Sequence, residues 1–321
     1  MNGPELIHAT LVTGASGFVG QALTATLRLH GYRVRAVTRA SSNGGASGET
    51  VFIDDIGPAT NWAAALAGCD TVVHLAAHVH VARGKAADAD FHRINVEGTA
   101  NLARQAARGG VRRFVFLSTV KVNGEVSGGR PFVESDPSAP ADAYGRSKAQ
   151  AEECLRDLAG KTGMEIVILR PPLVYGPGVK ANFLSLLRVV DAGVPLPLAS
   201  VENRRSLVYI GNLVDAIETC LRHPLAANKC FFVSDDVYLS IAELAIQLAA
   251  ALGRQSRLIA CPPALLRLAG RIAGKSEQVA RLTESLQVDV SRISKELTWR
   301  PPINTQQGLA ETASWYLRQK A

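Results

Sequence analysis

The stretch Leu11-Val12-Thr13-Gly14-Ala15-Ser16-Gly17-Phe18-Val19-Gly20 decides the fold of this chain. An apolar run, Ala9 to Val12, predicts a buried strand before the glycines, and periodic leucines predict a helix after them. A strand, a tight turn and a helix N-terminus let the backbone approach a pyrophosphate, whose charge the helix dipole stabilises. A side chain at Gly14 or Gly17 would hold the phosphate away. The stretch therefore predicts a dinucleotide-binding turn, although a glycine triplet alone also fits a plain turn.

Apolar strands and amphipathic helices alternate through the first half of the chain. The strand-like segments are 32–38, 51–53, 70–77, 113–118 and 165–169, and the longest helix-like segments between them are 91–108 and 144–158. This alternation predicts an α/β fold with a doubly wound parallel sheet of the Rossmann type.

The pattern changes after Arg170, where prolines and glycines interrupt the alternation. Segments 207–210 and 230–233 look like strands that rejoin the sheet. We therefore expect a second, smaller, interleaved C-terminal domain that binds the substrate. The predicted domains are a dinucleotide-binding domain of residues 1–170, with 206–235 rejoining its sheet, and a substrate domain of residues 171–205 and 236–321.

Composition narrows the class of protein. The chain has 321 residues, 47% of them hydrophobic and 20% charged, which is typical of one large or two modest globular domains. We expect no membrane span and no signal peptide, because no apolar run is long enough and the N-terminus has no basic start. Five cysteines without paired spacing indicate a reduced, cytoplasmic protein. The net charge of +7, with scattered basic residues, favours phosphorylated small molecules over nucleic acid as ligands.

The sequence Tyr144-Gly145-Arg146-Ser147-Lys148 places a phenol and an ammonium one helical turn apart, on one face. A free tyrosine has a pKa of roughly 10, and a neighbouring cation lowers it. A phenol tuned in this way takes a proton from an alcohol while hydride leaves the carbon. The pair alone also fits an exposed helix surface, but behind a glycine-rich turn it predicts a catalytic pair.

Ser118 and Thr119 close the strand that precedes this helix. A hydroxyl at the carboxyl end of a parallel strand points to where ligands bind. We expect it to bond the reacting oxygen beside Tyr144; a simple strand-end cap is the alternative.

These motifs together resemble those of the extended short-chain dehydrogenases/reductases, in the branch of the UDP-glucose 4-epimerases. The resemblance covers nearly the whole chain and rests on an ordered set of matches. They are Gly14, Gly17 and Gly20; Asp55-Ile56; His74-Leu75-Ala76-Ala77; Asn95; Ser118-Thr119; Tyr144 with Lys148; Leu169 to Gly178; Arg205; and Glu296 to Pro302.

The resemblance implies site residues of three kinds. Thr119, Tyr144 and Lys148 would be catalytic, with Lys148 orienting the nicotinamide ribose. The cofactor would be bound by Gly14, Gly17, Phe18, Val19, Arg39, Asp55, Ile56, Leu75, Ala76, Ala77, Tyr144, Lys148 and Pro171. Lys121, Asn182 and Arg205 would bind a UDP-sugar, where Arg205 suits a phosphate because a guanidinium binds it bidentately.

Departures from the family pattern reduce the set of reactions that the resemblance allows. Val120 and Lys121 stand where sugar dehydratases carry an Asp-Glu pair, so 4,6-dehydration is not expected. Asn123 replaces a usual tyrosine and Leu173 a usual asparagine. The usual second phosphate arginine is not visible near residues 286–289, so the sequence does not place the uracil clamp.

The end of the second strand bears on the cofactor. NAD-binding relatives carry an acidic residue there, whereas this chain has Thr38-Arg39. An arginine pairs with a 2′-phosphate, which favours NADP(H); the alternative is NAD(H) with Arg39 stacked on the adenine. We accordingly favour an NADP(H)-linked reductase of a UDP-4-keto-hexose or N-acetylhexosamine over an NAD-dependent UDP-hexose 4-epimerase. Reduction of a non-sugar ketone and a non-catalytic NADP sensor are weaker alternatives.

Other features are weaker. His74, His78, His80 and His92 do not predict a metal site, since hydride chemistry needs none. The basic, apolar segment 262–286 predicts a lid or core helix, with peripheral membrane contact as the alternative. Segments 91–108 and 144–158 would form the dimer contact common in this family, so we expect a homodimer.

Overall fold

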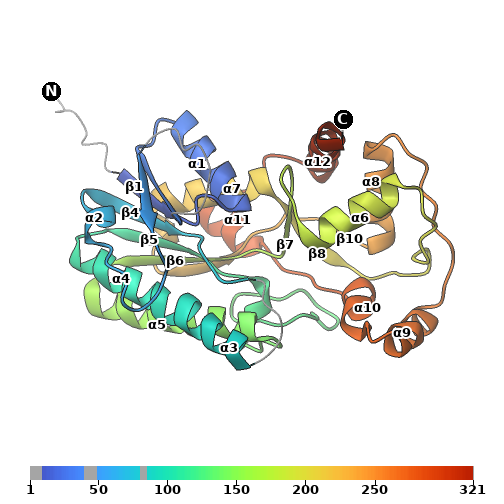
Figure 1. Ribbon diagram of the computed structural model, residues 1–321, viewed down its shortest axis with the longest axis horizontal. Coiled ribbons are helices and arrows are strands. Elements are labelled where there is room, and N and C mark those ends of the chain that lie inside the picture. Colours follow the sequence, from blue (N-terminus) through green and yellow to red (C-terminus); the bar gives the residue numbers. More distant parts are fainter. Residues whose placement is uncertain (1–8, 40–48, 80–84, 321) are drawn as a thin grey trace.

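A computed structural model describes residues 9–39, 49–79 and 85–320 of the chain (Figure 1). In this part of the chain, seven parallel strands form one sheet in the order β3-β2-β1-β4-β5-β6-β9. They are β1 (Ala9–Thr13), β2 (Val34–Arg39), β3 (Thr50–Ile53), β4 (Cys69–His74), β5 (Arg113–Leu117), β6 (Glu165–Arg170) and β9 (Lys229–Phe232). The order reverses between β1 and β4, which is the point where sheets of this kind bind ligands beyond their carboxyl ends.

Helices cover both faces of this sheet (Figure 1). One face carries α1 (Phe18–Leu29), α7 (Ile210–Arg222) and α11 (Ser291–Leu297), and the other carries α2 (Ala63–Leu66), α4 (Thr99–Arg108) and α5 (Ala143–Thr162). Leu23 and Leu213 are fully buried in the first core, and Leu102 and Leu155 in the second. The predicted doubly wound α/β fold is confirmed, because parallel strands buried on both faces need a helical layer on each side.

A smaller sheet carries the rest of the chain. Its strands, in the order β10-β8-β7, are β7 (Leu173–Tyr175), β8 (Arg205–Tyr209) and β10 (Tyr238–Leu239). The helices after β6 that belong to this lobe are α6 (Ala181–Asp191), α8 (Ile241–Ala251), α9 (Pro263–Ile272), α10 (Ser276–Thr283) and α12 (Thr305–Lys320). A third core fills the space between α6, α8, α12 and this sheet. The chain thus builds the smaller C-terminal domain that the sequence predicts.

One strand assignment from the sequence is wrong. Segment 230–233 does rejoin the large sheet, as β9 beside β6, but segment 207–210 does not. Its strand, β8, pairs instead with β7 and β10. Pro171 and Pro172 explain the difference, because they follow β6 directly, lack the N–H groups that would extend its ladder, and redirect the chain into β7.

The segment predicted as a helix, 91–108, is helical throughout, but its first part is not α-helical. It runs from the last residue of α3 (Lys85–Phe91) through a π-helical segment η1 (His92–Gly98) into α4. A Cβ on Gly98 would lie 2.9 Å from the Ile56 side chain, so the chain passes close to the loop after β3 at this point. Two short 3₁₀ turns, η2 (Val120–Val122) and η3 (Pro224–Ala226), complete the elements.

No helix in the described part of the chain is both long enough and apolar enough to cross a membrane.

Candidate active site

The sheet brings the predicted site residues to a single edge. Gly14 follows β1, Arg39 ends β2, Asp55 follows β3, Ala76 follows β4 and Thr119 follows β5. Because the strands are parallel, the carboxyl end of every one of them lies at this same edge. Residues that are more than a hundred positions apart in sequence therefore line one site.

The glycine-rich turn is packed too closely for side chains. Gly14 has a φ of +69°, and a Cβ there would lie 2.8 Å from the backbone nitrogen of Ala76. The Gly17 N–H donates to the Gly14 carbonyl over 2.9 Å. A Cβ on Gly20 would lie 2.1 Å from that same carbonyl oxygen. The three glycines thus fold the turn onto itself and onto the end of β4.

This turn fits the pyrophosphate of a dinucleotide. Gly17 is exposed, and as the N-cap of α1 it provides no side chain to bond the first N–H groups of the helix. Those donors and the helix dipole therefore remain directed at a bound anion. At the end of β2, the Thr38 hydroxyl is buried without a hydrogen-bond partner among the described residues. The edge thus offers polar groups over the length that a dinucleotide needs.

The far end of this edge is charged. Asp55 accepts a hydrogen bond from the Ile56 N–H over 2.8 Å and forms an ion pair with Arg93. Arg39, the last residue of β2, is exposed, and the strand itself ends in Thr38-Arg39 with no acidic residue among its last described positions. An adenosine at this edge would lie beside these two groups.

Thr119 is held between β5 and β6 by its neighbours. The Ser118 N–H donates to Leu169 over 2.7 Å, and the Val120 N–H donates to Pro171 over 3.0 Å. The Thr119 hydroxyl accepts a hydrogen bond from the Lys121 N–H and caps the turn η2. This hydroxyl therefore fits both interpretations from the sequence, a cap and a donor to the reacting oxygen, because it caps a turn and also lies at the edge of the sheet.

Asp142 begins the helix that carries the tyrosine. Its side chain caps α5 by accepting from the Gly145 N–H over 2.7 Å. Tyr144 lies in the first turn, with its ring 6.2 Å from that of Phe91. Burial raises the pKa of the Tyr144 phenol above its ordinary value, and the Asp142 carboxylate raises it further. The sequence predicts a lowered pKa, so the direction is opposite, because burial and the Asp142 carboxylate both disfavour the charged phenolate.

Lys148 is fully buried one turn further along α5. Its ammonium lies 4.1 Å from the centre of the Phe116 ring on β5. Burial lowers the pKa of this ammonium to about 7, although the Glu152 carboxylate opposes the shift. The pKa of Lys148 thus lies near neutral pH, so the charge of this buried lysine responds strongly to any charge bound beside it.

A histidine helps to hold the glycine-rich turn in place. His74, at the end of β4, is bonded through Nδ1 to Thr13 over 2.7 Å and through Nε2 to Thr99 over 2.9 Å. Its ring stacks on Phe116. Burial, and then the Lys148 charge, lower the pKa of His74 to about 3. This histidine is a neutral structural group that ties the glycine-rich turn to η1 and α4.

The His74 environment predicts an acid-sensitive fold. Its ordinary pKa is 6.5 and its pKa in the folded protein about 3, so between these values the unfolded chain binds the extra proton. Stability is therefore complete above pH 6.5 and falls as the pH falls toward 3. Denaturant unfolding of His74→Phe across this range should show a smaller dependence on pH than wild type. The exposed His92→Phe should keep the wild-type slope, and an unchanged slope in His74→Phe would contradict the assignment.

A buried ion pair lies next to Ser118, one turn after Lys148 on α5, and the sequence did not indicate it. Glu152, fully buried on α5, accepts bonds from the Ser118 hydroxyl over 2.6 Å and from Arg170. Arg170 also donates to the Asn123 side chain over 2.9 Å. The position noted only as a departure, Asn123, is thus a partner of this arginine. Removing Glu152 would leave the buried Arg170 guanidinium without its ion-pair partner.

Asn95 joins two parts of the site. Its side-chain oxygen accepts from the His78 N–H over 2.7 Å, and its amide donates to the Ser147 hydroxyl over 3.0 Å. This connects the chain after β4 to the helix of Tyr144 and Lys148. His80, which the sequence analysis also named, lies outside the described residues. Among the described residues, no group of three metal-ligating side chains is arranged to hold a metal ion.

The predicted substrate residues occupy different environments. Lys121 forms ion pairs with Glu125 over 2.6 Å and with Asp142 over 2.5 Å. Arg205 donates to the carbonyl of Arg281, and burial lowers the pKa of this guanidinium. No hydrogen bond among the described residues joins Asn182, which is exposed in the first turn of α6, to these groups.

Arg281 is a further candidate that the sequence did not identify. This residue on α10 stands beside Arg205 and lies 3.8 Å from Glu125. Two guanidinium groups held near each other form a site for a dianionic group such as a diphosphate. No local motif marks Arg281, because the helix that carries it meets β8 only in the folded chain.

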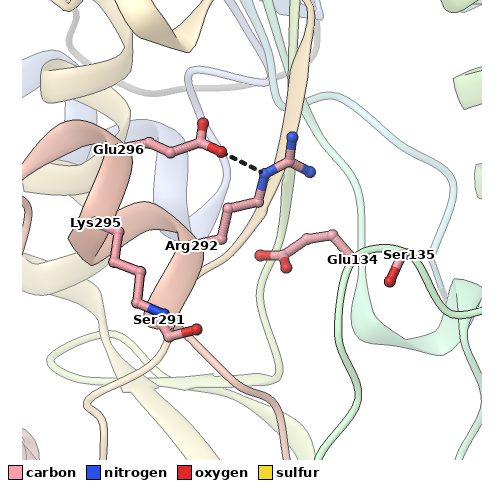
Figure 2. Close-up of a pocket in the computed structure, with 6 residues that line it drawn as sticks. All are labelled: Glu134, Ser135, Ser291, Arg292, Lys295 and Glu296. Carbon is pink, nitrogen blue, oxygen red and sulfur yellow. Dashed lines mark hydrogen bonds and ion pairs between the residues drawn. The ribbon is translucent and has the colours of Figure 1, made fainter.

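A separate surface cavity lies between α11 and the loop that carries Glu134 and Ser135 (Figure 2). It has a volume of about 480 Å³ and is lined by Glu134, Ser135, Ser291, Arg292, Lys295 and Glu296 (Figure 2). The Glu134 carboxylate accepts from the Phe232 N–H over 2.9 Å, and Arg292 pairs with Glu296. None of the predicted site residues lines it. This cavity is therefore not the candidate site that the sequence predicts at the carboxyl edge of the large sheet.

The fold and this edge define a Rossmann-type oxidoreductase of the extended short-chain dehydrogenase/reductase class. The chain belongs to the NAD dependent epimerase/dehydratase family, which it matches over residues 10–232. It is 45% identical over 319 residues to the UDP-glucose 4-epimerase of Vibrio cholerae, covering 98% of this chain and 97% of that one.

Two more distant relatives share the whole length. One, from Escherichia coli O157:H7, is N-acetyl-alpha-D-glucosaminyl-diphospho-ditrans,octacis-undecaprenol 4-epimerase, with 28% identity over 95% of this chain and 94% of that one. The solved structure of MoeE5 in complex with UDP-glucuronic acid and NAD matches with a TM-score of 0.79 and 25% identity. This match covers 97% of this chain and 99% of that chain. The chain is thus an enzyme of the short-chain dehydrogenase/reductase type.

Proposed function

We propose that this protein is an NAD-dependent 4-epimerase of a UDP-hexose. The observation that carries the proposal is that Lys148, one turn after Tyr144 on α5, lies over the Phe116 ring near the carboxyl end of β5, the strand that Thr119 follows. This arrangement supports hydride transfer next to a proton-transferring phenol. Support for epimerisation, in preference to the NADP-linked reduction favoured from the sequence, comes from the 45% identity to a UDP-glucose 4-epimerase.

The side chains have distinct tasks in this reaction. A bound nicotinamide would supply a hydride acceptor for the C4 carbon of the sugar. Tyr144 removes the proton of the 4-hydroxyl as the hydride leaves, and Thr119 donates a hydrogen bond to the same oxygen. Tyr144 must be a phenolate to accept this proton, and a charged Lys148 would stabilise that form. Once the 4-keto sugar has turned, Tyr144 would return the proton to the C4 oxygen, and a bound reduced nicotinamide would supply the hydride to the opposite face of C4.

The substrate contacts follow from charge. Arg205 and Arg281 would bind the diphosphate, since the Arg205 guanidinium donates a hydrogen bond to the backbone carbonyl of Arg281 and each residue carries a guanidinium. Asn182, at the start of α6, would bond the same nucleotide. Lys121 stands two residues from Thr119 and would reach the sugar if it left its ion pairs with Glu125 and Asp142.

One observation favours a second function. The end of β2 carries Arg39, an exposed arginine, where NAD-specific enzymes have an acidic residue. This favours NADP(H) and, with it, reduction of a UDP-4-keto-hexose. The two functions share every catalytic residue and differ in whether the cofactor is retained or consumed.

A cofactor-free assay separates the two functions. We expect the purified protein to interconvert UDP-glucose and UDP-galactose without added cofactor, and to release NAD when denatured. The reason is that an epimerase regenerates its cofactor in each turnover. The measurement is chromatography of the UDP-sugars and of the released nucleotide. Absence of conversion, together with NADPH-dependent reduction of a UDP-4-keto sugar, would instead establish the reductase.

We also propose that α4 and the outer face of α5, which lie side by side on one face of the sheet (Figure 1), form a homodimer contact. Sedimentation velocity of the purified protein would give the oligomeric state. The cytoplasmic location stays a prediction from the cysteine pattern.

A further inference from the structure

Helix α9 stands at the outer end of the smaller lobe, beside α10 (Figure 1). Its sequence, PALLRLAGRI, combines leucines and an isoleucine with two arginines. The sequence analysis favoured a lid or core helix for this segment. The core interpretation is wrong for most of α9, because Gly270 is its only residue that is buried.

One narrow side holds α9 to the protein. Leu266 packs against the core of the smaller lobe. Four residues later, Gly270 lets α10 pack closely against α9, since a Cβ at Gly270 would lie 2.5 Å from the Val279 side chain. Positions 266 and 270 lie on one face of a helix. The other faces of α9 are therefore not used to build the fold.

A second face of α9 exposes large apolar side chains. Leu265, Leu268 and Ile272 are 56%, 53% and 82% exposed. Their spacing of three and four residues places them in one stripe along the helix. Large apolar side chains gathered on an exposed surface mark an interaction site more often than apolar side chains scattered singly.

The chain around this stripe is rich in basic residues. Between Leu252 and Ser276 the chain has five basic residues, Arg254, Arg257, Arg267, Arg271 and Lys275, and no acidic residue. The whole chain has 35 Lys and Arg and 28 Asp and Glu, which gives a net charge of +7. This segment alone carries a net charge of +5. Arg254 and Arg267 pair with Asp191 and Glu284. The other three basic residues form no ion pair with any side chain that the structure describes.

We propose that α9 is a docking surface for an anionic lipid bilayer. An exposed apolar stripe beside unpaired basic side chains is what a helix needs to lie in the headgroup region. The apolar side chains would enter the lipid, and Arg257, Arg271 and Lys275 would meet the lipid phosphates. A contact with a second copy of this chain fits less well, because a two-fold axis at α9 would bring these cations together. The proposal is independent of the reaction that the enzyme catalyses.

Vesicle sedimentation tests this proposal with the full chain. We expect wild type to co-sediment with vesicles of equal parts phosphatidylglycerol and phosphatidylcholine, and far less with phosphatidylcholine alone or at high salt. The triple variant Leu265→Ser, Leu268→Ser, Ile272→Ser should bind the anionic vesicles at least about tenfold more weakly, because it loses the apolar contact. Its thermal unfolding and its turnover of soluble substrate should match those of wild type.

A composition-matched variant provides the control. Leu29→Ser, Leu225→Ser, Ile246→Ser removes two leucines and an isoleucine that are also exposed but lie on other elements. It should bind the vesicles as wild type does. The proposal is overturned if wild type does not bind anionic vesicles, or if both triple variants lose binding equally. It is also overturned if the α9 variant changes the oligomeric state and leaves vesicle binding intact.

Discussion

Tyr144→Phe is expected to lower kcat by about 10²–10⁴-fold, the usual contribution of a positioned proton-transferring group. The substitution removes one oxygen from a side chain whose ring already packs near Phe91. The fold and the affinity for dinucleotide should therefore stay close to those of wild type. Steady-state turnover of UDP-hexose, with thermal unfolding in parallel, measures both effects.

Tyr238→Phe is the matched control for this substitution. Tyr238 lies on β10 and donates its hydroxyl proton to the Val288 carbonyl over 3.1 Å, away from the sheet edge. Its loss should cost about 1 kcal/mol of stability and leave kcat unchanged. Wild-type turnover by Tyr144→Phe would remove the tyrosine from the mechanism and with it the proposed chemistry.

Gly20→Ala is expected to destabilise the protein by about 3 kcal/mol and to abolish dinucleotide binding. A Cβ at this position would lie 2.1 Å from the Gly14 oxygen and 2.7 Å from the Ala15 Cα. Both atoms are backbone, so neither can move without opening the turn. Denaturant unfolding gives the stability, and the nucleotide released on denaturation gives the occupancy of the site.

Gly160→Ala separates this clash from a general effect of glycine replacement. Gly160 lies inside α5, and a Cβ there would meet nothing within 4 Å. Alanine should therefore stabilise the helix by up to about 1 kcal/mol, with full dinucleotide binding. If Gly20→Ala were as stable as wild type and kept its nucleotide, close packing of the turn would not be the reason for a glycine at position 20.

Local pattern was enough to predict the first part of the fold. The run from Ala9 to Gly20, and the strands that follow it, have a periodicity that reports directly which faces are buried. The pairing of β8 could not be predicted in this way, because strand propensity does not name the partner strand. Two prolines after β6 settled the partner, and their effect depends on where the chain can go next.

The same distinction applies to the candidate site, where some residues can be predicted from local sequence and others cannot. Thr119, Tyr144 and Lys148 were found from their spacing, because one helical turn and one strand end place them without further information. Glu152, Arg170 and Arg281 were not, since their partners come from distant segments. The direction of the Tyr144 pKa shift was also wrong, because a neighbouring cation is visible in sequence but burial is not.

The sequence by itself determined the order of the elements, the glycine-rich turn and the spacing of the phenol and the ammonium. These depend on backbone conformation and helical periodicity, which act over a few residues. Only the tertiary structure decided which side chains lose water, which charges face each other, and that the stripe of Leu265, Leu268 and Ile272 is exposed. Desolvation and Coulomb energy depend on everything packed around a group, and that environment is assembled from the whole chain.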